Sequence, residues 1–229
     1  MRYLVTGANR GIGLEFVRQL AARGDTVEAV ARRPERSPLL LELAQRSPAL
    51  VRLHTADVTN DYNVRALAGE FEGVGIDVLV NNAGVMGRLA PLAEIDLEDV
   101  MHTFAVNAVS PLRLARALLP ALRRGQARRI VHITSKMGSI DDNKSGGAYG
   151  YRMSKAALNM ASRSLANDLR GEEMVSAVLH PGWVKTDMGG PGAMISTEES
   201  VRGLLRVMDG LTLAHSGRFF SYAGEEVPW

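Results

Sequence analysis

Short runs of apolar and β-branched residues alternate along the chain with longer stretches in which apolar residues recur at helical spacing. The runs cover residues 3–6, 27–31, 51–54, 77–80, 130–134, 176–179 and 218–222. Several are almost wholly apolar, as expected for strands that are covered on both faces of a parallel sheet. Because such units join through right-handed crossovers, the sequence predicts an α/β fold with a doubly wound parallel sheet and helices on both faces.

The stretches between the runs predict six helices, at about residues 12–20, 39–46, 62–71, 96–122, 148–170 and 197–208. The fourth is long, and we expect it to bend near Pro111. No repeat, low-complexity tract or long linker divides the chain. We therefore expect residues 1–229 to form a single domain.

Composition excludes several classes of function. The chain has no cysteine, so disulfides, thiolate metal sites and cysteine nucleophiles are excluded, and a reducing compartment is favoured. No apolar run is long enough to span a bilayer, and the first strand begins almost at Met1, which leaves no room for a signal peptide. The net charge is only +2, which is weak support for a nucleic-acid partner. We expect a cytoplasmic protein with no membrane, nucleic-acid or metal partner.

A glycine-rich turn, Thr6-Gly7-Ala8-Asn9-Arg10-Gly11-Ile12-Gly13, follows the first strand and opens the first helix. Free backbone N–H groups and the positive end of a helix dipole suit such a junction to phosphate, and glycines permit the close approach of a pyrophosphate. A purely structural turn is the alternative, but the position between strand and helix favours phosphate binding.

Polar or small residues also follow the later strands. Asn81-Asn82-Ala83-Gly84 follows the fourth, Asp57 the third, Ser135 the fifth and residues 181–186 the sixth. Because ligands bind beyond the carboxyl ends of strands in open sheets, we expect these segments to meet at one edge. Each alone is also compatible with a plain turn. Asp57 could instead start the next helix, although Asn60 is better placed to cap it.

Tyr151 and Lys155 are four residues apart in a predicted helix, so the phenol and the ammonium share one face. A nearby cation favours the phenolate, so we expect Lys155 to lower the Tyr151 pKa from its ordinary value of about 10. Tyr149 lies in the same segment, but the residue four positions on is Met153, which carries no charge. Tyr151 is therefore the predicted acid–base, although a lone Tyr-x-x-x-Lys pair is usually a coincidence on a surface.

Taken together and in this order, the motifs argue against coincidence. The chain resembles the short-chain dehydrogenase/reductase family over essentially its whole length, on residues 6–13, Asp57, 81–84, Asn107, Ser135, 151–155 and 181–182. The resemblance implies a Rossmann-type sheet of seven parallel strands and a nicotinamide cofactor. It also implies that Tyr151 exchanges a proton with the substrate oxygen, which Ser135 positions. Lys155 would hold the nicotinamide ribose and depress the tyrosine pKa, and Asn107 would support a water-mediated proton relay to the lysine.

The expected cofactor contacts lie in the same motifs and at the end of the second strand. They are Gly7, Asn9, Arg10, Gly11, Ile12, Gly13, Arg32, Asp57, Val58, Asn82, Ala83, Gly84, Tyr151, Lys155, Pro181, Gly182, Val184 and Thr186. The second strand ends at Ala31, where NAD-specific folds place an acidic residue, and Arg32 follows. A guanidinium can grip a 2′-phosphate through two charge-assisted bonds, and Arg10 could approach it from the other side. NADP(H) is therefore the predicted cofactor, with NAD(H) also compatible.

Residues 135–140, 146–152, 186–191 and 224–229 further resemble the C-factor and sniffer-type carbonyl reductase branch. We expect an NADP(H)-dependent oxidoreductase that transfers a hydride between nicotinamide and a carbonyl or alcohol substrate, and that reduces small aldehydes, ketones or quinones. The alternative is a cofactor-binding regulatory or signalling protein of the C-factor type, although a pure sensor would not need the tyrosine. A nucleotide-sugar epimerase of the extended branch would need a further C-terminal domain, and the chain ends too early for one.

The spacing from Ser135 to Tyr151 is 16 residues, a few more than in most of the family. We expect the extra residues, 141–147, to form a loop at the mouth of the site, and residues 187–200 to form a second lid. The sequence leaves open the physiological substrate, the direction of reaction and the choice among homodimer, homotetramer and monomer.

Overall fold

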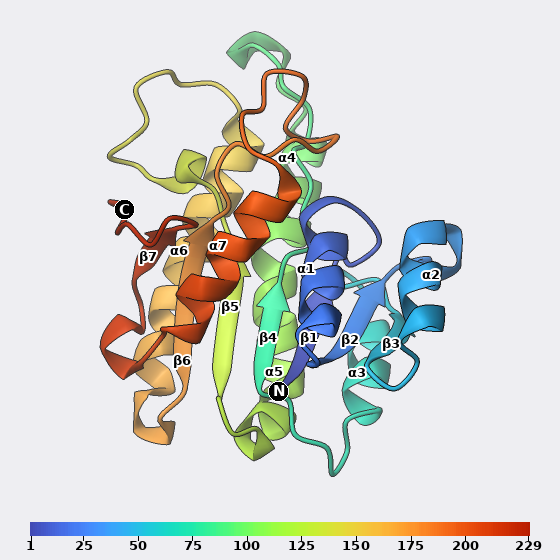
Figure 1. Cartoon of the computed structure of the whole chain (residues 1–229). Helices are drawn as coiled ribbons and strands as arrows, with labels where there is room; N and C mark the ends of the chain where they lie inside the picture. The colour runs from blue at the N-terminus through green and yellow to red at the C-terminus, as the bar shows by residue number, and fades with distance from the viewer.

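The structure is a computed structural model that describes residues 1–229. Seven parallel strands form one sheet in the order β3-β2-β1-β4-β5-β6-β7. The strands are β1 (Arg2–Thr6), β2 (Thr26–Ala31), β3 (Val51–Thr55), β4 (Val78–Asn81), β5 (Arg129–Ile133), β6 (Val175–His180) and β7 (Phe219–Ser221). The strand order reverses at β1, and the carboxyl ends of the central strands point to the edge of the sheet where the longest loops lie (Figure 1).

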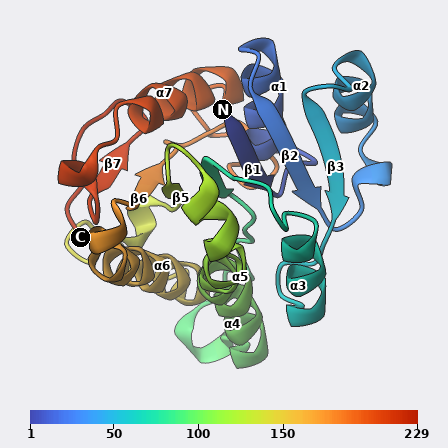
Figure 2. The ribbon, with the colours of Figure 1, turned by 90° about the horizontal axis from the view of Figure 1, so that it is seen from below.

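Seven helices cover the two faces of the sheet. They are α1 (Gly11–Ala22), α2 (Pro38–Arg46), α3 (Asp61–Gly69), α4 (Leu97–Phe104), α5 (Ser110–Arg124), α6 (Tyr149–Asp168) and α7 (Thr197–Asp209). Viewed along the sheet, α1, α2 and α7 lie on one side, and α3, α4, α5 and α6 lie on the other (Figure 2). The predicted doubly wound α/β fold is confirmed.

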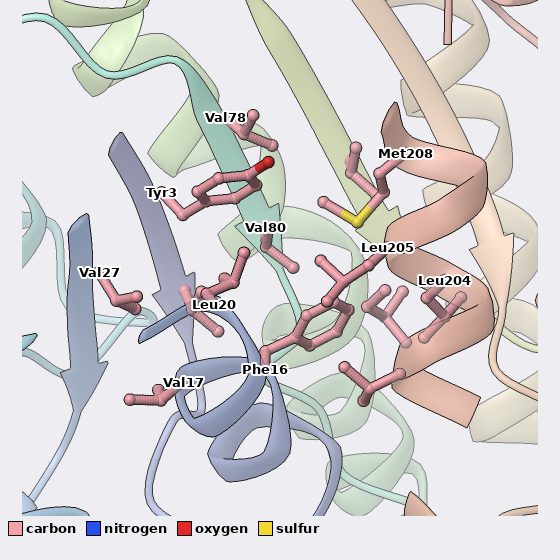
Figure 3. Close-up of a cluster of buried hydrophobic side chains, with 14 of the residues drawn as sticks. Tyr3, Phe16, Val17, Leu20, Val27, Val78, Val80, Leu204, Leu205 and Met208 are labelled. Carbon is pink, nitrogen blue, oxygen red and sulfur yellow. The ribbon is translucent and has the colours of Figure 1, made fainter. Parts of the chain in front are cut away.

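The core has one large apolar cluster on each face. On the first face, α1 and α7 pack against the central strands, and the side chains of Phe16, Leu20 and Leu205 meet those of Tyr3 and Val80 (Figure 3). On the other face, α3 and α5 contribute to a second cluster over the same strands. Because both faces of β1 and β4 are buried, the two strands are held firmly, and the loops that follow them start from fixed positions.

The predicted strands agree with the observed ones to within one residue at either end. The long helix predicted over residues 96–122 agrees closely with the helical run of residues 97–124, but the prediction missed a π-helical segment inside it. A π-helical segment, Ala105–Val109, separates α4 from α5, and the Ser110 N–H donates to the carbonyl of Ala105, five residues back. Pro111 lies in the first turn of α5, where a missing N–H costs little.

A buried ionic cluster joins β2, β3 and the residue that follows α3. Glu28 is only 1% exposed, and its carboxylate contacts Arg2 Nη1 at 2.5 Å and His54 Nε2 at 2.8 Å. The other ring nitrogen of His54 lies 2.7 Å from Glu70 Oε2. Burial opposes both charges, but the mutual contacts outweigh it: the pKa of Glu28 is lowered and the pKa of His54 is raised. The ionised Glu28 therefore lies in the middle of β2, well away from the carboxyl end of the strand.

The cluster should make stability depend on pH. The His54 contribution is complete below the ordinary pKa of 6.5 and is lost as the pH rises through the raised value. The Glu28 contribution is complete above 4.5 and is lost as the pH falls through the lowered value. Urea unfolding of the native protein and of His54→Gln should therefore differ most at about pH 5.5, and clearly less at about pH 9. A difference that does not change with pH would contradict this account.

No helix of the structure has the length and apolar character needed to cross a bilayer.

Candidate active site

The glycine-rich turn leads from β1 into α1 at the carboxyl edge of the sheet, and the loop after β4 braces it. The Thr6 hydroxyl accepts hydrogen bonds from the backbone N–H groups of Asn82 and Ala83, both at 3.0 Å. The Asn82 side chain donates in return to the carbonyl of Thr6 at 2.8 Å. The Asn82 amide therefore shapes the turn, whereas the sequence suggested only a ligand contact for it.

Three glycines in these two loops leave no space for a side chain. A Cβ on Gly13 would lie 2.1 Å from the Gly7 carbonyl oxygen, and one on Gly7 would lie 2.9 Å from Ala83 Cα. Gly7 also has a φ of +66°, which disfavours other residues. A Cβ on Gly84 would lie 3.2 Å from Asn107 Oδ1 and 3.6 Å from Lys155 Nζ. The glycines therefore let the β1 turn, the start of α1 and the loop after β4 pack closely against one another, as the tight turn and close packing of a dinucleotide-binding loop require.

Arg32 and Asp57 lie beyond the ends of β2 and β3 on the same edge. Arg32 is exposed and forms no ion pair, but its charge acts on Asp57. Burial alone would raise the Asp57 pKa, yet the hydrogen bonds from Thr59 and the charge of Arg32 hold it below its ordinary value. Asn60 caps α3 by accepting from the Asn63 N–H, as predicted. Asp57 is only partly free, because its Oδ1 accepts two bonds from Thr59.

The loop after β6 crosses to the glycine-rich turn. The Thr186 methyl group lies 3.3 Å from the position of a Cβ on Gly11. Arg10 Nη1 forms an ion pair with Asp187 Oδ2 at 2.6 Å, and both side chains are well exposed. Arg10 therefore has a carboxylate partner that a cofactor phosphate would have to displace, which the sequence did not reveal. The predicted lid over residues 187–200 is too long, because α7 begins at Thr197.

The remaining predicted contacts are placed mainly by their backbone. The side chains of Val58 and Val184 are buried, at 8% and 4% exposure, so only their main-chain groups can face a ligand. The Pro181 carbonyl accepts from Ser200 Oγ at 2.6 Å. Gly182 has a φ of +83°, and a Cβ there would meet Ile195. Asn9 and Ile12 lie half-buried in the glycine-rich turn and at the start of α1.

Ser135, Tyr151 and Lys155 are brought together by the packing of the turn after β5 against α6. A Cβ on Gly138 would lie 2.7 Å from Lys155 Cβ, so only glycine lets the turn approach the helix so closely. The Ser135 hydroxyl accepts from the Met137 N–H at 3.1 Å and lies near enough to the Tyr151 phenol to act on its pKa. Tyr151 is 8% exposed and Tyr149 is 40% exposed, so the two tyrosines differ in burial as well as in the residue four positions on.

The predicted lowering of the Tyr151 pKa is wrong for this structure. Burial raises the pKa of the phenol, and the nearby Ser135 hydroxyl only partly opposes the increase. The Lys155 ammonium does lie on the same helix face, 5.7 Å from the centre of the tyrosine ring. However, it donates to the Ile133 carbonyl at 2.9 Å, and burial lowers its own pKa to about 8. Desolvation therefore dominates at both groups.

Asn107 lies in the π-helical segment and is fully buried. Its Nδ2 donates to the Val85 carbonyl at 2.8 Å and to Ser154 Oγ at 3.0 Å, and its Oδ1 accepts from the Val85 N–H at 2.9 Å. Ser154 Oγ donates in turn to the Tyr151 carbonyl at 2.8 Å. The side chain thus joins the loop after β4 to the helix of Tyr151, and the proposed proton relay stays a prediction.

Sequence reasoning missed His180, the last residue of β6. Its Nδ1 accepts from the backbone N–H of Lys136, next to Ser135, at 3.3 Å. Burial lowers the pKa of His180 to about 4, so the ring is neutral beside the turn that holds Ser135. The sequence predicted that β5 and β6 end at the same edge of the sheet. A polar residue at the end of β6 could therefore have indicated that His180 lies near Ser135.

Comparisons with known proteins agree with this geometry. A family model described as short chain dehydrogenase matches residues 2–193. C-signal of Myxococcus xanthus is 59% identical over 154 residues, which are 67% of this chain and 93% of that protein. Carbonyl reductase Sniffer of D. melanogaster has a TM-score of 0.95 and 33% identity, covering 100% of this chain and 99% of its own. An NADPH-bound carbonyl reductase from chicken fatty liver has a TM-score of 0.92 and 35% identity, covering 100% and 98%.

Proposed function

The chain belongs to the short-chain dehydrogenase/reductase family of oxidoreductases, and on this basis we propose that it reduces small aldehydes, ketones or quinones with NADP(H). The proposal rests mainly on the proximity of Ser135, Tyr151 and Lys155 at the carboxyl edge of the sheet, beside the glycine-rich turn after β1 and the loop after β4. The similar Sniffer and chicken liver proteins are both described as carbonyl reductases, which supports the same direction of reaction here. We also propose a cytoplasmic location.

The residues of this chain fit the cofactor. The close packing at Gly7, Gly13 and Gly84 forms a tight turn at the N-terminus of α1 and brings the loop after β4 next to Lys155, which supports binding of a dinucleotide with its pyrophosphate at the helix end. Arg32 and Asp57 would hold the adenosine end, and Lys155 the nicotinamide ribose. When bound, NADP(H) supplies the hydride.

Tyr151 would supply the proton in carbonyl reduction. Its raised pKa keeps the phenol protonated at neutral pH, so Oη is ready to donate to a substrate oxygen. Ser135 Oγ, which lies beside the phenol, would hold the same oxygen in place. The burial of Tyr151 and Lys155 excludes water from the reacting atoms and strengthens these contacts.

A substrate screen tests the proposed function directly. Purified protein should oxidise NADPH in the presence of some members of a broad panel of aldehydes, ketones and quinones, and the oxidation should be absent without them. Failure to oxidise NADPH or NADH with every member of the panel would overturn the reductase proposal.

The preference for NADP(H) gives a second test. Arg32 is exposed without a carboxylate partner, so it is free to bind a 2′-phosphate. Arg32→Ala should weaken NADPH binding about 10- to 100-fold, as expected for the loss of charge-assisted bonds, and should leave NADH binding almost unchanged. Arg33→Ala, one residue on and also exposed, is the matched control. A native protein that prefers NADH at equal concentration would refute the assignment.

A cofactor-binding signalling role is the second candidate, and the similarity to C-signal over two thirds of the chain favours it. The two candidates differ in what Tyr151 must do. If Tyr151→Phe, with cofactor binding intact, still performs the cellular role, then signalling by the folded protein is sufficient. If that variant fails in the cell, turnover is required.

A further inference from the structure

Arg152 follows the proposed acid Tyr151, and its guanidinium donates to three acceptors in two separate segments, the loop before α6 and the turn after β5. Nη2 donates to Ser145 Oγ at 2.8 Å, Nε donates to the Gly146 carbonyl at 3.2 Å, and Nη1 donates to the Met137 carbonyl at 3.4 Å. The side chain is half-buried and forms no ion pair. Its whole charge is therefore directed at these neutral acceptors, which strengthens the bonds it makes.

The loop that Arg152 contacts has few other attachments. Residues 141–147 are all exposed, and in Figure 1 the loop projects from the body between β5 and α6. Its first part is held by an ion pair from Asp142 to Lys136 and by a bond from the Asp141 N–H to the Trp229 carbonyl. For residues 144–147, every hydrogen bond to another part of the protein comes from Arg152.

The backbone conformation at the end of the loop is one that contacts from outside the loop must help to hold. Gly146, Gly147 and Ala148 have φ values of +66°, +63° and +45° in succession. A Cβ on either glycine would find no atom within 4 Å, so packing does not define this part of the chain. Glycine samples many conformations, so a single well-formed loop here depends on the two bonds from the guanidinium to Ser145 and Gly146.

The third acceptor connects the loop to the proposed catalytic groups. Met137 offers its carbonyl to Arg152 and donates its own N–H to Ser135 Oγ at 3.1 Å. One side chain thus ties the loop, the turn of Ser135 and the first turn of the helix that carries Tyr151.

We propose that Arg152 is a positioning residue for the substrate: it holds the loop of residues 141–147 against the Ser135 turn and thereby shapes one wall of the carbonyl-binding site. The inference rests on the proposed reductase function for its kinetic consequence. Arg152 acts through the loop and the turn. It does not need to touch the cofactor, so cofactor binding should be independent of it.

Arg152→Met removes the donors but keeps most of the apolar stem. The KM for a carbonyl substrate should rise about tenfold, as expected for the loss of one strong hydrogen-bonded contact, with kcat changed less than about threefold and the NADPH dissociation constant unchanged. Arg152→Lys, which can reach only part of the acceptor set, should give an intermediate KM. Arg163→Met is the matched control, because Arg163 lies on the same helix and donates to the Gly217 carbonyl, away from the loop.

A second readout needs no turnover. A lysine-specific protease should cut after Lys144 at least about tenfold faster in Arg152→Met, since cleavage follows local opening. Cutting after Lys185, which is exposed in the loop after β6, gives the internal reference. Unchanged cleavage at Lys144, or faster cleavage with an unchanged KM, overturns the positioning role while the reductase proposal stands. If the native protein reduces no carbonyl, the proposed function fails, and with it the assigned role of the loop in substrate binding.

Discussion

Replacing Tyr151 by phenylalanine should lower kcat for carbonyl reduction by about 10²- to 10⁴-fold, the usual contribution of a positioned general acid. The change removes only the hydroxyl that faces Ser135, and the ring keeps its buried position. NADPH binding, measured by the fluorescence of the reduced nicotinamide, should stay within about twofold of the native value. Steady-state kinetics with one good carbonyl substrate and that binding titration together provide the measurement.

Tyr149→Phe is the control for this prediction, because Tyr149 begins the same helix but is 40% exposed. It should retain nearly full activity. An inactive Tyr149→Phe together with an active Tyr151→Phe would reverse the assignment. Equal and complete loss in both variants would point to damage to the start of α6 and would leave neither tyrosine singled out as the acid.

Replacing Gly13 by alanine should weaken NADPH binding more than about 100-fold and destabilise the fold by about 1–3 kcal/mol, as overpacking of a tight site does. The added methyl group would lie 2.1 Å from the Gly7 carbonyl oxygen and 2.6 Å from Asn82 Nδ2. Because neither the backbone of the turn nor the braced amide can move aside, the loop itself must change shape. Urea unfolding and a NADPH titration measure the two effects.

Gly69→Ala is a suitable control, since Gly69 ends α3, has no positive φ, and a Cβ there meets nothing within 4 Å. It should be neutral or slightly stabilising, because alanine favours a helix more than glycine does. If Gly13→Ala bound NADPH as tightly as the native protein, the proposed binding of the cofactor at the glycine-rich turn would be wrong.

Much of the fold was predictable because each strand can be recognised from its own short run of apolar residues. Runs such as 3–5 and 78–80 are wholly apolar, as expected for central parallel strands that are covered on both faces. Helix ends were less certain. The break at Ala105–Val109 carries no glycine or proline, so nothing in the local sequence distinguished a π-helical segment from a continuous helix with a bend at Pro111.

The candidate site was predictable where one local motif carries one chemistry, and less so where distant segments meet. The glycine-rich turn and the Tyr151–Lys155 pair belong to the first kind. The Arg10–Asp187 ion pair joins residues 177 positions apart, and no local pattern indicates it. The pKa of Tyr151 depends on burial and on where Lys155 directs its ammonium. Spacing along a helix determines which face two residues share, but not which acceptor a flexible side chain chooses.

The π-helical segment also determines what kind of genetic change can move Asn107. Each residue of an α-helix turns the chain by about 100°, and a π-helical segment accommodates one residue more than the α geometry would. Deleting a single residue between 105 and 109 would restore a regular helix with α4 and α5 in nearly their present orientation, but the residues that remain in the segment would turn about the axis by up to about that angle. Asn107 would then leave Val85 and Ser154, which it now bridges. The number of residues in the segment therefore determines where Asn107 points. Substitutions within the segment that preserve its length should be tolerated far better than a one-residue deletion.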